Sequence, residues 1–534
     1  MKNLKISLAV LVVAAAASPA VFATAYYLSD CDEGASSACV PGNDDNAGTS
    51  PSAPWRTTAK IQGLFKSLKP GDSLLFARGA SFVNAGMKLQ HASASAGSPM
   101  LFADYKPAWS VGAGAKPILT DTRDGVAVFA IGGVFNGIPS QGFTLRNLDL
   151  RGGPKALRGV FLRDGVGHVT IENLTISGFN IAIQSSGPSS HLKLLNSTIR
   201  DNGGQGFLGG GVDVLIEGNR FDNNGFSKAV FNHNVYISGG ERVTVRGNTL
   251  TRSTIVDGKC QGVSLVVHGT STGLVIENNL VEETAAANTC YGIAVDPGYA
   301  KAEDFRGTVI RGNRVINVGG LGIGVASCPD CLIENNLIVK NVPGGMIGIA
   351  VPDRNRGAED TPDDSVTVRN NSIFIGLPTE GSVGIRVGTE GANHVVVSNL
   401  VQFGPAASIR TSCFSIKGLS PAAFRLFDNN MCHFTGVIGK WESNHSTLAS
   451  WQSTGLDVGS KLSNPMISTP TGPAYSMLPQ VGSPAINAGN AKLSSPKDML
   501  GKPRGALPDM GAYESAGGSV DKLPPAAPSS VTLQ

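Results

Sequence analysis

The chain has 534 residues, and 43 Lys and Arg against 40 Asp and Glu leave a formal net charge of +3. Nucleic acid needs a surface of one charge sign, so this balance argues against a nucleic-acid partner. The 68 glycines follow no Gly-X-Y period and therefore exclude a collagen-like chain. Their number favours many short strands joined by many tight turns.

The first 25 residues, MKNLKISLAVLVVAAAASPAVFATA, have the layout of a secretory signal peptide. Two lysines precede an apolar run over residues 6–17, and the small residues 23–25 offer a cleavage site. We therefore expect a mature protein that begins near Tyr26 and is secreted, to the periplasm or outside the cell. No later stretch reaches the roughly 18 apolar residues that a spanning helix needs, so no membrane span is predicted.

Eight cysteines lie mostly in local pairs, which is typical of disulfides formed in an oxidising compartment. The expected pairs are Cys31 with Cys39, Cys260 with Cys290, Cys328 with Cys331, and Cys413 with Cys432. The CPDC motif at 328–331 could alternatively hold zinc, but neither a second such motif nor a histidine at ligand spacing accompanies it. Disulfides are therefore the favoured interpretation.

One short phrase recurs along the chain from residue 145 onward. Its copies are LRNLDL (145–150), IENLTI (171–176), LLNSTI (194–199), IEGNRF (216–221), VRGNTL (245–250), IENNLV (276–281), IRGNRV (310–315), IENNLI (333–338), VRNNSI (368–373) and VSNLVQ (397–402). Apolar and polar residues alternate within each copy, as in a strand with one buried face. Most copies precede a second short strand of the form Gly-[Val/Ile]-x-[Val/Leu]. Each repeat is thus predicted to be one coil of at least two strands.

The copies begin 22 to 35 residues apart. Such irregular spacing argues against solenoids of paired helices, whereas the shortest spacing matches one turn of a parallel β-solenoid. Additional residues must then lie in outward loops. Asparagines at one place in successive coils are expected to stack as an internal ladder, namely Asn219, Asn248, Asn279, Asn313, Asn336 and Asn371.

With these repeats, the chain resembles right-handed parallel β-helix proteins of the pectate-lyase-like superfamily. The resemblance implies an all-β fold, a right-handed parallel β-helix of about ten or more coils. Residues 26–142 would form an N-terminal cap and first coils, because segments 26–29, 42–57 and 68–79 resemble the entry segment of such proteins. Residues 143–402 would form the central helix. Residues 403–514 would hold the last coils and a closing segment, followed by a flexible tail over 515–534.

Outward residues at equivalent positions of successive coils should form rows along the solenoid, because neighbouring strands lie about 4.8 Å apart. The expected rows are Arg158, Gln205, His233, Gln261 and Tyr291; then Phe161, Ala182, Tyr236, Ser264 and Ala294; and then Arg163, Gln184, Ser238, Val266 and Asp296. Long insertions at 226–232, 253–261, 296–307 and 352–365 wall the middle of these rows. Small residues at Ala294, Gly324 and Ala350 would leave a groove floor.

The resemblance implies polysaccharide lyases, glycoside hydrolases, uronan epimerases and non-catalytic adhesins, and the fold alone does not choose among them. A lyase needs a base at C5, a neutraliser of the carboxylate and an acid for the leaving oxygen. We expect His233 or Lys259 as the base, Tyr236 or Tyr291 as the acid, and Arg386 or Lys259 as the neutraliser. The expected substrate-binding residues are Arg158, Arg163, Gln205, Gln261, His268 and Lys301.

No cofactor is required by these residues, although Asp296 with acidic residues of the 359–364 loop could hold calcium. A hydrolase needs two converging carboxylates, and only Asp296 lies on the expected rows, so hydrolysis ranks second. The favoured function is β-elimination on a linear acidic polysaccharide, alginate-like or pectate-like, by a monomer. The alternatives are a hydrolase, an epimerase, or a surface protein that binds polysaccharide without cleaving it, with His233 as a structural corner residue.

Overall fold

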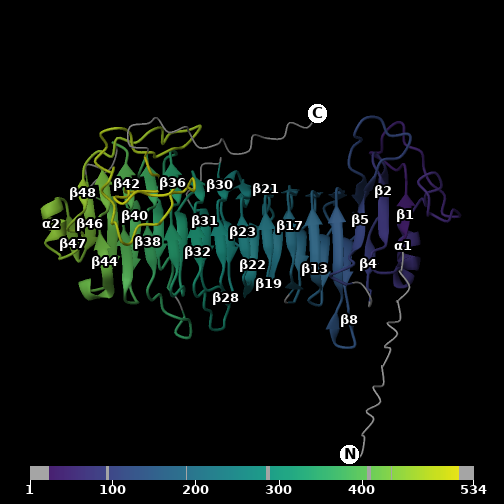
Figure 1. Ribbon diagram of the computed structural model, residues 1–534, viewed down its shortest axis with the longest axis horizontal. Coiled ribbons are helices and arrows are strands. Elements are labelled where there is room, and N and C mark those ends of the chain that lie inside the picture. The colour runs from purple at the N-terminus through teal and green to yellow at the C-terminus, as the bar shows by residue number, and fades with distance from the viewer. Residues whose placement is uncertain are drawn as a thin grey trace, which may run out of the picture.

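The computed structural model describes residues 23–91, 95–187, 189–283, 289–355, 357–405, 410–433 and 436–515. Three long sheets run side by side along one axis, and nearly all pairings within them are parallel (Figure 1). Each coil gives one strand to each sheet. The prediction of an all-β, right-handed parallel β-helix is confirmed. The expected signal sequence and tail fall largely outside the described residues and stay predictions.

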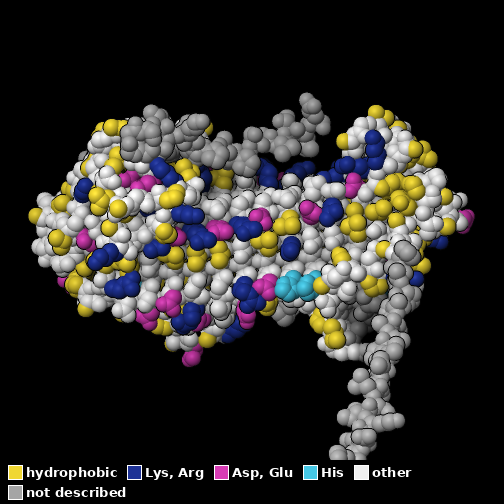
Figure 2. All heavy atoms as spheres, in the orientation of Figure 1, with side chains coloured by type: hydrophobic (Ala, Val, Ile, Leu, Met, Phe, Trp, Pro, Cys, Tyr) yellow, Lys and Arg dark blue, Asp and Glu magenta, His cyan; other side chains and the backbone are white. Residues whose placement is uncertain are grey.

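The first sheet has fourteen strands. They are β1 (Ala25–Leu28), β2 (Ser73–Ala77), β5 (Met100–Tyr105), β10 (Gln141–Arg146), β13 (Gly167–Glu172), β17 (Lys193–Leu195), β20 (Leu215–Glu217), β23 (Thr244–Arg246), β29 (Val275–Glu277), β32 (Val309–Arg311), β35 (Leu332–Glu334), β38 (Thr367–Arg369), β41 (His394–Val397) and β44 (Phe424–Asp428). Outward Arg and Glu alternate along it. Arg246 pairs with Glu217 at 2.8 Å and Arg311 with Glu277 at 2.7 Å, and Figure 2 shows this row of opposite charges across the face.

The second sheet also has fourteen strands. They are β3 (Ser81–Val83), β6 (Ile118–Thr120), β11 (Asp149–Arg151), β14 (Thr175–Ser177), β18 (Thr198–Arg200), β21 (Arg220–Asp222), β24 (Thr249–Thr251), β30 (Leu280–Glu282), β33 (Arg314–Ile316), β36 (Leu337–Lys340), β39 (Ser372–Ile375), β42 (Leu400–Phe403), β45 (Met431–His433) and β48 (Lys461–Leu462). The segment from residue 463 to residue 515 folds back along the outer face of its later strands (Figure 1).

The third sheet carries the residues of the predicted groove. Its main strands are β4 (Met87–Leu89), β7 (Ala127–Gly132), β12 (Arg158–Arg163), β15 (Ile181–Ser185), β19 (Phe207–Val212), β22 (His233–Glu241), β27 (Val263–Val267), β31 (Tyr291–Val295), β34 (Leu321–Val325), β37 (Ile347–Val351), β40 (Val383–Gly388), β43 (Ser412–Lys417), β46 (Val437–Trp441) and β47 (Ser443–His445). Two short strands, β16 (Ser189–Ser190) and β28 (Ser271–Thr272), pair at its side. Two small hairpins lie outside it, β8 (Val134–Phe135) with β9 (Ile138–Pro139), and β25 (Ile255–Val256) with β26 (Lys259–Cys260).

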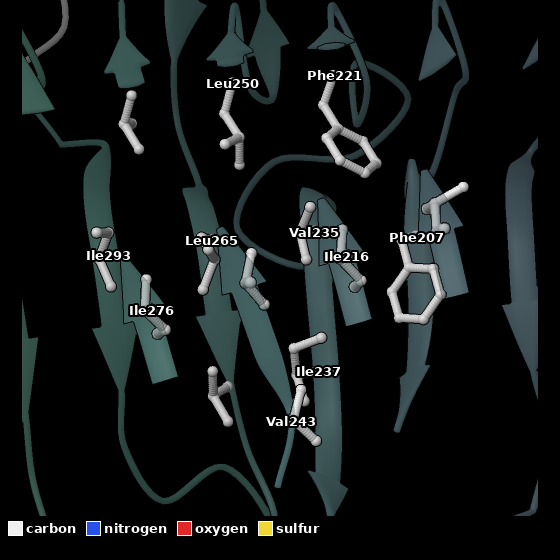
Figure 3. Close-up of a cluster of buried hydrophobic side chains, with 14 of the residues drawn as sticks. Phe207, Ile216, Phe221, Val235, Ile237, Val243, Leu250, Leu265, Ile276 and Ile293 are labelled. Carbon is white, nitrogen blue, oxygen red and sulfur yellow. The ribbon is translucent and has the colours of Figure 1, made fainter. Parts of the chain in front are cut away.

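One apolar core fills the interior between the three sheets. Val235 and Ile237 of β22 are fully buried in it, with Leu265 and Ile293 beside them in the following coils (Figure 3). Full burial of such a side chain stabilises the fold by about 1.5–3 kcal/mol. This burial gives β22 one buried face, with Val235 and Ile237 as its inward residues.

Short helices cover the two ends of this core. At the first coil, α1 (Ala59–Leu64) and the 3₁₀ turn Phe65–Ser67 bury Ile61 and Phe65, and Phe65 packs near Phe102. At the last coil, α2 (Leu448–Gln452) buries Trp451, and a second 3₁₀ turn spans Pro421–Ala423. None of the helices in the described segments is long and apolar enough to cross a membrane.

The asparagine ladder is confirmed and continues further than predicted, through Asn399 and Asn430. At each step the side-chain oxygen accepts from the backbone and side-chain N–H groups of the preceding asparagine, as Asn313 does from Asn279 at 3.0 Å. Its own Nδ2 donates to a backbone carbonyl, that of Ile276 at 2.9 Å. The ladder thereby satisfies polar groups that the coil corners bury. The four expected disulfides are also present.

Candidate functional site

His233 opens β22 and is only 4% exposed. Its Nδ1 lies 2.9 Å from the carbonyl oxygen of Val263, which can only accept, so this nitrogen carries the hydrogen. Burial lowers the pKa of His233 to about 4. The ring is therefore neutral at ordinary pH and is a weak base.

The rings of Tyr236, His268 and Tyr299 form a row of contacts that begins at His233. The ring of Tyr236 lies 5.6 Å from that of His233 and 5.4 Å from that of His268. The hydroxyl of Tyr236 donates to that of Tyr299 at 2.9 Å, and Tyr299 is 40% exposed. Burial and this hydrogen bond raise the pKa of Tyr236 well above its ordinary value, so its hydroxyl stays protonated.

Asp296 and Asp353 form a buried carboxyl pair at the ends of β31 and β37. Asp296 binds Arg354 at 2.8 Å and Nδ1 of His268 at 3.1 Å, so it carries the negative charge. Burial raises the pKa of Asp353 well above its ordinary value, and the charge of Asp296 and a hydrogen bond to it raise the pKa further. Two carboxylates in contact cannot both ionise. The pair therefore favours the protonated form of Asp353.

His268 supports the charged member of this pair. Its Nδ1 also lies 2.7 Å from the backbone oxygen of Asp296. Burial lowers the pKa of His268, but the hydrogen bonds to Asp296 outweigh it, and the pKa is raised above its ordinary value. Arg354, whose side chain is 42% exposed, lies on the solvent side of the pair.

Two glycines leave room for these side chains. A methyl group on Gly324 would meet Asp353 Cβ at 2.6 Å and its Oδ2 at 2.7 Å, distances that real side chains do not tolerate. A methyl group on Gly298 would overlap the ring of His268. The small residue expected at Gly324 thus makes space for Asp353 rather than an empty groove floor.

A cavity of about 320 Å³ opens beside Asp353, toward the later coils. Its lining consists of Pro352, Asp353, Arg354, Asn355, Arg386, Gly388, Thr389 and Lys417. Arg386 donates to the backbone oxygens of Pro352 and Asp353 at 3.3 and 3.2 Å. The predicted neutraliser Arg386 therefore lies next to the carboxyl pair, although sequence alone did not predict that pair.

All three expected rows were partly wrong in register. His233 pairs with Val263 and then Tyr291, so Gln261 does not stand between them. Tyr236 pairs with Val266 in place of Ser264, and Ser264 is fully buried. Ala182 is likewise a core residue, with Gln184 on the row of Phe161.

In the third expected row, Val266 was misplaced by two residues, in the place of His268. Val266 pairs with Ala294, and Asp296 follows Val295 at the strand end. Its backbone N–H donates to Val267, so it neighbours His268 across the coils. The physical reason is that the insertions before the strands differ in length from coil to coil. Counting positions from the nearest glycine therefore does not show which residues lie side by side.

The other predicted residues are dispersed. Lys259 is exposed on the β25–β26 hairpin, and Gln261 donates to Val256 there. Tyr291 lies at the opposite end of β31 from Asp296. Lys301 lies 5.7 Å from the ring centroid of Tyr299 and thus near Tyr236.

Three predicted substrate-binding residues lie in earlier coils or bind a loop. Arg158 and Arg163 are both on β12, with β15 and β19 between them and β22. Arg158 is held over the ring of Phe161 at 4.2 Å. Gln205 donates to the carbonyl oxygen of Phe231 at 3.0 Å and so fixes the 226–232 loop.

The acidic loop proposed as calcium ligands has other partners. Asp360 accepts from the backbone N–H of Glu303, Asp363 from that of Cys328, and Asp364 from that of Ala392. Within the described ranges, no group of three or more His, Cys, Asp or Glu side chains is placed to hold a metal ion. Asp296 binds Arg354 and His268.

Asp353, Arg354, Tyr299 and Gly324 are the residues of this site whose roles the sequence analysis did not predict. A signal for Asp353 was present. GVSLVVH (262–268) and GIAVDP (292–297) place His and Asp directly after the strands of adjacent coils, and GIAVPD (348–353) places an Asp one residue later after the strand, two coils further on. An alignment from the strand ends would have brought His268, Asp296 and Asp353 together.

The parallel coils and their internal ladder define this chain as a right-handed parallel β-helix protein. Residues 134–303 match the family described as a right handed beta helix region. A lacto-N-biosidase from Bifidobacterium longum subsp. longum is 26% identical over 154 residues. That match covers 29% of this chain and spans only 8% of the relative's length.

Several solved structures share the fold at low identity. Pectate lyase Pel9A is 14% identical, with a TM-score of 0.40 over 93% of this chain and 98% of its own. The Dettilon tailspike protein is 14% identical, with a TM-score of 0.43 over 67% of this chain and 64% of its own. A GH136 lacto-N-biosidase from Eubacterium ramulus is 12% identical, with a TM-score of 0.37 over 63% of this chain and 67% of its own.

Proposed function

We propose that this protein is a secreted enzyme that hydrolyses a glycosidic bond in a polymeric glycan, with Asp353 as the acid and Asp296 as the base. The observation that carries the proposal is the buried carboxyl pair, in which burial and the charge of Asp296 raise the pKa of Asp353 while Asp296 pairs with Arg354 and His268. Glycoside hydrolysis needs such a division, because one carboxyl protonates the leaving oxygen while the other activates water or attacks the sugar.

Substrate must separate the carboxyl groups of Asp296 and Asp353 for this chemistry. The carboxyl groups of hydrolases stand about 5 to 9.5 Å apart, whereas Asp296 and Asp353 are in hydrogen-bond contact in the free protein. Arg354, on the exposed side, would swing toward the incoming sugar and release Asp296. Asp353 would then donate its proton to the glycosidic oxygen, and His268 would keep Asp296 in position.

The disulfides of this chain and the names of similar proteins also support the proposal. Four disulfides suit a protein that folds outside the cytoplasm. Two of the similar proteins are named lacto-N-biosidase, which is a glycan-cleaving activity. Another is named pectate lyase, and this name also points to a glycan. Long loops on a rigid solenoid suit a chain-like substrate.

Elimination on an acidic polysaccharide is the second candidate, and Arg386 in the cavity favours it. Arg386 could neutralise a uronate carboxylate, and the hydroxyl of Tyr236 could protonate the leaving oxygen. His233 is the weak point, because its Nδ1 is occupied and burial lowers its pKa to about 4. Hydrolysis requires no role of His233.

The test is a panel of glycans, with reducing ends and ultraviolet absorbance of unsaturated ends read in parallel, with and without calcium and a chelator. We expect reducing ends without new absorbance. Asp353→Asn and Asp296→Asn should each lower kcat by at least about hundredfold, the scale of general acid–base catalysis. Glu359→Gln, an exposed carboxylate change in the loop that carries Asp353, is the matched control.

The same assay separates the two chemistries. Unsaturated products that vanish in His233→Ala, with Asp353→Asn still active, would establish elimination instead. The rate of hydrolysis should also fall on the alkaline side of its pH profile in proportion to loss of the Asp353 proton, because a deprotonated Asp353 cannot act as the acid. A profile that keeps rising through that range would contradict the assigned acid.

A further inference from the structure

We infer that the substrate is a mixed glycan, with an anionic sugar on the later-coil side of the carboxyl pair and an uncharged sugar on the earlier-coil side. This inference rests on the proposed function, since it takes Asp296 and Asp353 as the marker of the scissile bond. It concerns the charge pattern of the substrate, which neither hydrolysis nor the fold specifies.

The later-coil side presents cations without counter-ions. Arg386 and Lys417 line the cavity beside Asp353, and neither has a carboxylate partner within the described part of the chain. On the first sheet, by contrast, Arg246 and Arg311 each hold a glutamate. Arg386 is half-buried, whereas Lys417 is exposed. A half-buried positive charge usually has an anionic partner, so a ligand carboxylate or sulfate is expected to supply one for Arg386.

Asp353 does not cancel these charges. It is the one acidic residue of the cavity lining, and its proton-sharing contact with Asp296 leaves it neutral. Arg354 adds a third cation at the same cavity and would be freed when substrate displaces it from Asp296. The cavity, at about 320 Å³, is large enough for one sugar unit.

The earlier-coil side has the opposite character. Tyr236 and Tyr299 present aromatic rings next to His268, and aromatic faces pack well on the apolar faces of sugar rings. Buried Glu303 lies below them, with its carboxylate on the backbone N–H groups of Gly269 and Gly298 at 3.0 and 2.6 Å. Its charge, with that of Asp296, disfavours a second anion here.

Lys301 does not give the earlier-coil side the cationic character of the later-coil side, because its ammonium lies over the ring of Tyr299. The two sides are also far enough apart to hold different sugars. Tyr236 and Arg386 occupy one outward row, separated by Val266, Ala294, Gly324 and Ala350. Five steps of that row span about 24 Å, with the carboxyl pair between the ends.

Calorimetry with defined oligosaccharides tests the inference in the Asp353→Asn background, where substrate is not consumed. The probes are a hyaluronan oligosaccharide of alternating glucuronate and N-acetylglucosamine, its carboxyl-reduced form, and oligogalacturonate. Keratan sulfate and its desulfated form test sulfate as the anionic group. The variants are Arg386→Gln, Lys417→Gln and, as a control, Arg425→Gln, which removes an exposed cation of β44 outside the cavity.

We expect one mixed charged chain to bind roughly tenfold or more tightly than both its uncharged form and oligogalacturonate, the scale of a charge-assisted hydrogen bond. Arg386→Gln should abolish the difference between charged and uncharged forms, and Arg425→Gln should not. Equal binding of the uncharged form, equal binding of oligogalacturonate, an unchanged preference in Arg386→Gln, or no binding at all would overturn the inference.

Cleavage assays on the protein with Asp353 intact test the proposed function separately from this binding result. Hydrolysis without a charge preference would leave the catalytic proposal standing and overturn the inference. If a charged chain binds preferentially but no bound chain is cleaved, the inferred charge pattern of the substrate would stand and the proposed hydrolysis would be contradicted.

Discussion

At the scale of single residues, the environment of each carboxyl group decides what it can do. Asp296 pairs with Arg354 and His268, whereas burial and the charge of Asp296 raise the pKa of Asp353. Neither state follows from residue type. A methyl group on Gly324 would overlap Asp353 and Leu321, so a change at that glycine should disturb the pair without altering either carboxyl group.

Gly324→Ala should reduce activity by about hundredfold, because the added methyl group pushes Asp353 out of contact with Asp296. Circular dichroism should show an unchanged β-sheet spectrum. The matched control is Gly63→Ala in α1, where a methyl group meets no atom within 4 Å. Full activity of Gly324→Ala would show that the position of Asp353 is unimportant.

Glu283 is a buried carboxyl group outside the site, and burial raises its pKa to about 8. One of its oxygens accepts from Ser253 at 3.0 Å, and the other has no hydrogen-bond partner among the described residues. A raised pKa in the folded state means that folding favours the protonated form. The stability of the protein should therefore fall as pH rises from the ordinary pKa of a glutamate through about 8.

Glu283→Gln should remove this pH dependence. At about pH 9 the variant should be more stable by roughly 1–3 kcal/mol, and at about pH 4 it should match the parent protein. Melting temperatures of both proteins across that range provide the measurement. A variant that is equally stable at both ends, or less stable at high pH, would show that Glu283 is ionised at little cost.

At the scale of elements, each coil is held to its neighbours by parallel strands and by the asparagine ladder. Asn313 in mid-ladder accepts two hydrogen bonds from Asn279 and donates one to Ile276. These groups are buried, so water does not readily replace the amide. Each ladder asparagine thus stabilises the coil before it as well as its own.

Asn313→Ala should lower the free energy of unfolding by roughly 2–5 kcal/mol, because several buried polar groups lose a partner. Asn444→Ala, on the exposed strand β47, is the control and should have little effect. Thermal melting followed by circular dichroism measures both. Equal melting temperatures would mean that strand pairing alone carries the solenoid.

At the scale of the whole molecule, the segment 463–515 joins several coils along one side. Met477, Met510 and Tyr513 pack on Leu337 and Leu400 of the second sheet in a small apolar cluster. Arg504, only 2% exposed, pairs with Glu514 at 3.1 Å and donates to Asn335 at 3.0 Å. The segment therefore clamps coils that are far apart in sequence.

Arg504→Ala should leave Glu514 buried without its partner, at a cost of about 3–5 kcal/mol to the docking of the segment. Limited proteolysis should then cut within residues 463–515 much faster than in the parent protein. Lys492→Ala, at an exposed position of the same segment, should not change the cutting rate. Persistent resistance of Arg504→Ala would show that the apolar cluster alone holds the segment.

Much of the architecture could be predicted because it is written in local repeats. A strand with one buried face alternates regardless of what surrounds it, and a ladder asparagine recurs at each corner. The burial of Val235 and Ile237, the ladder and the cysteine pairs all follow from such short-range patterns. Their physical causes act within one coil or between adjacent coils.

The site depended on contacts that only the folded chain makes. Asp353 reaches Asp296 across the coil of Gly324, and Arg354 and His268 then decide which carboxyl keeps the proton. Insertions of different length hide this alignment in the sequence, since a shift of two residues moves Asp296 from His268 to another row. The sequence by itself determined the solenoid, its ladder and its cysteine pairs. Tertiary structure decided which charged groups meet, because protonation depends on burial and on neighbours brought from other coils.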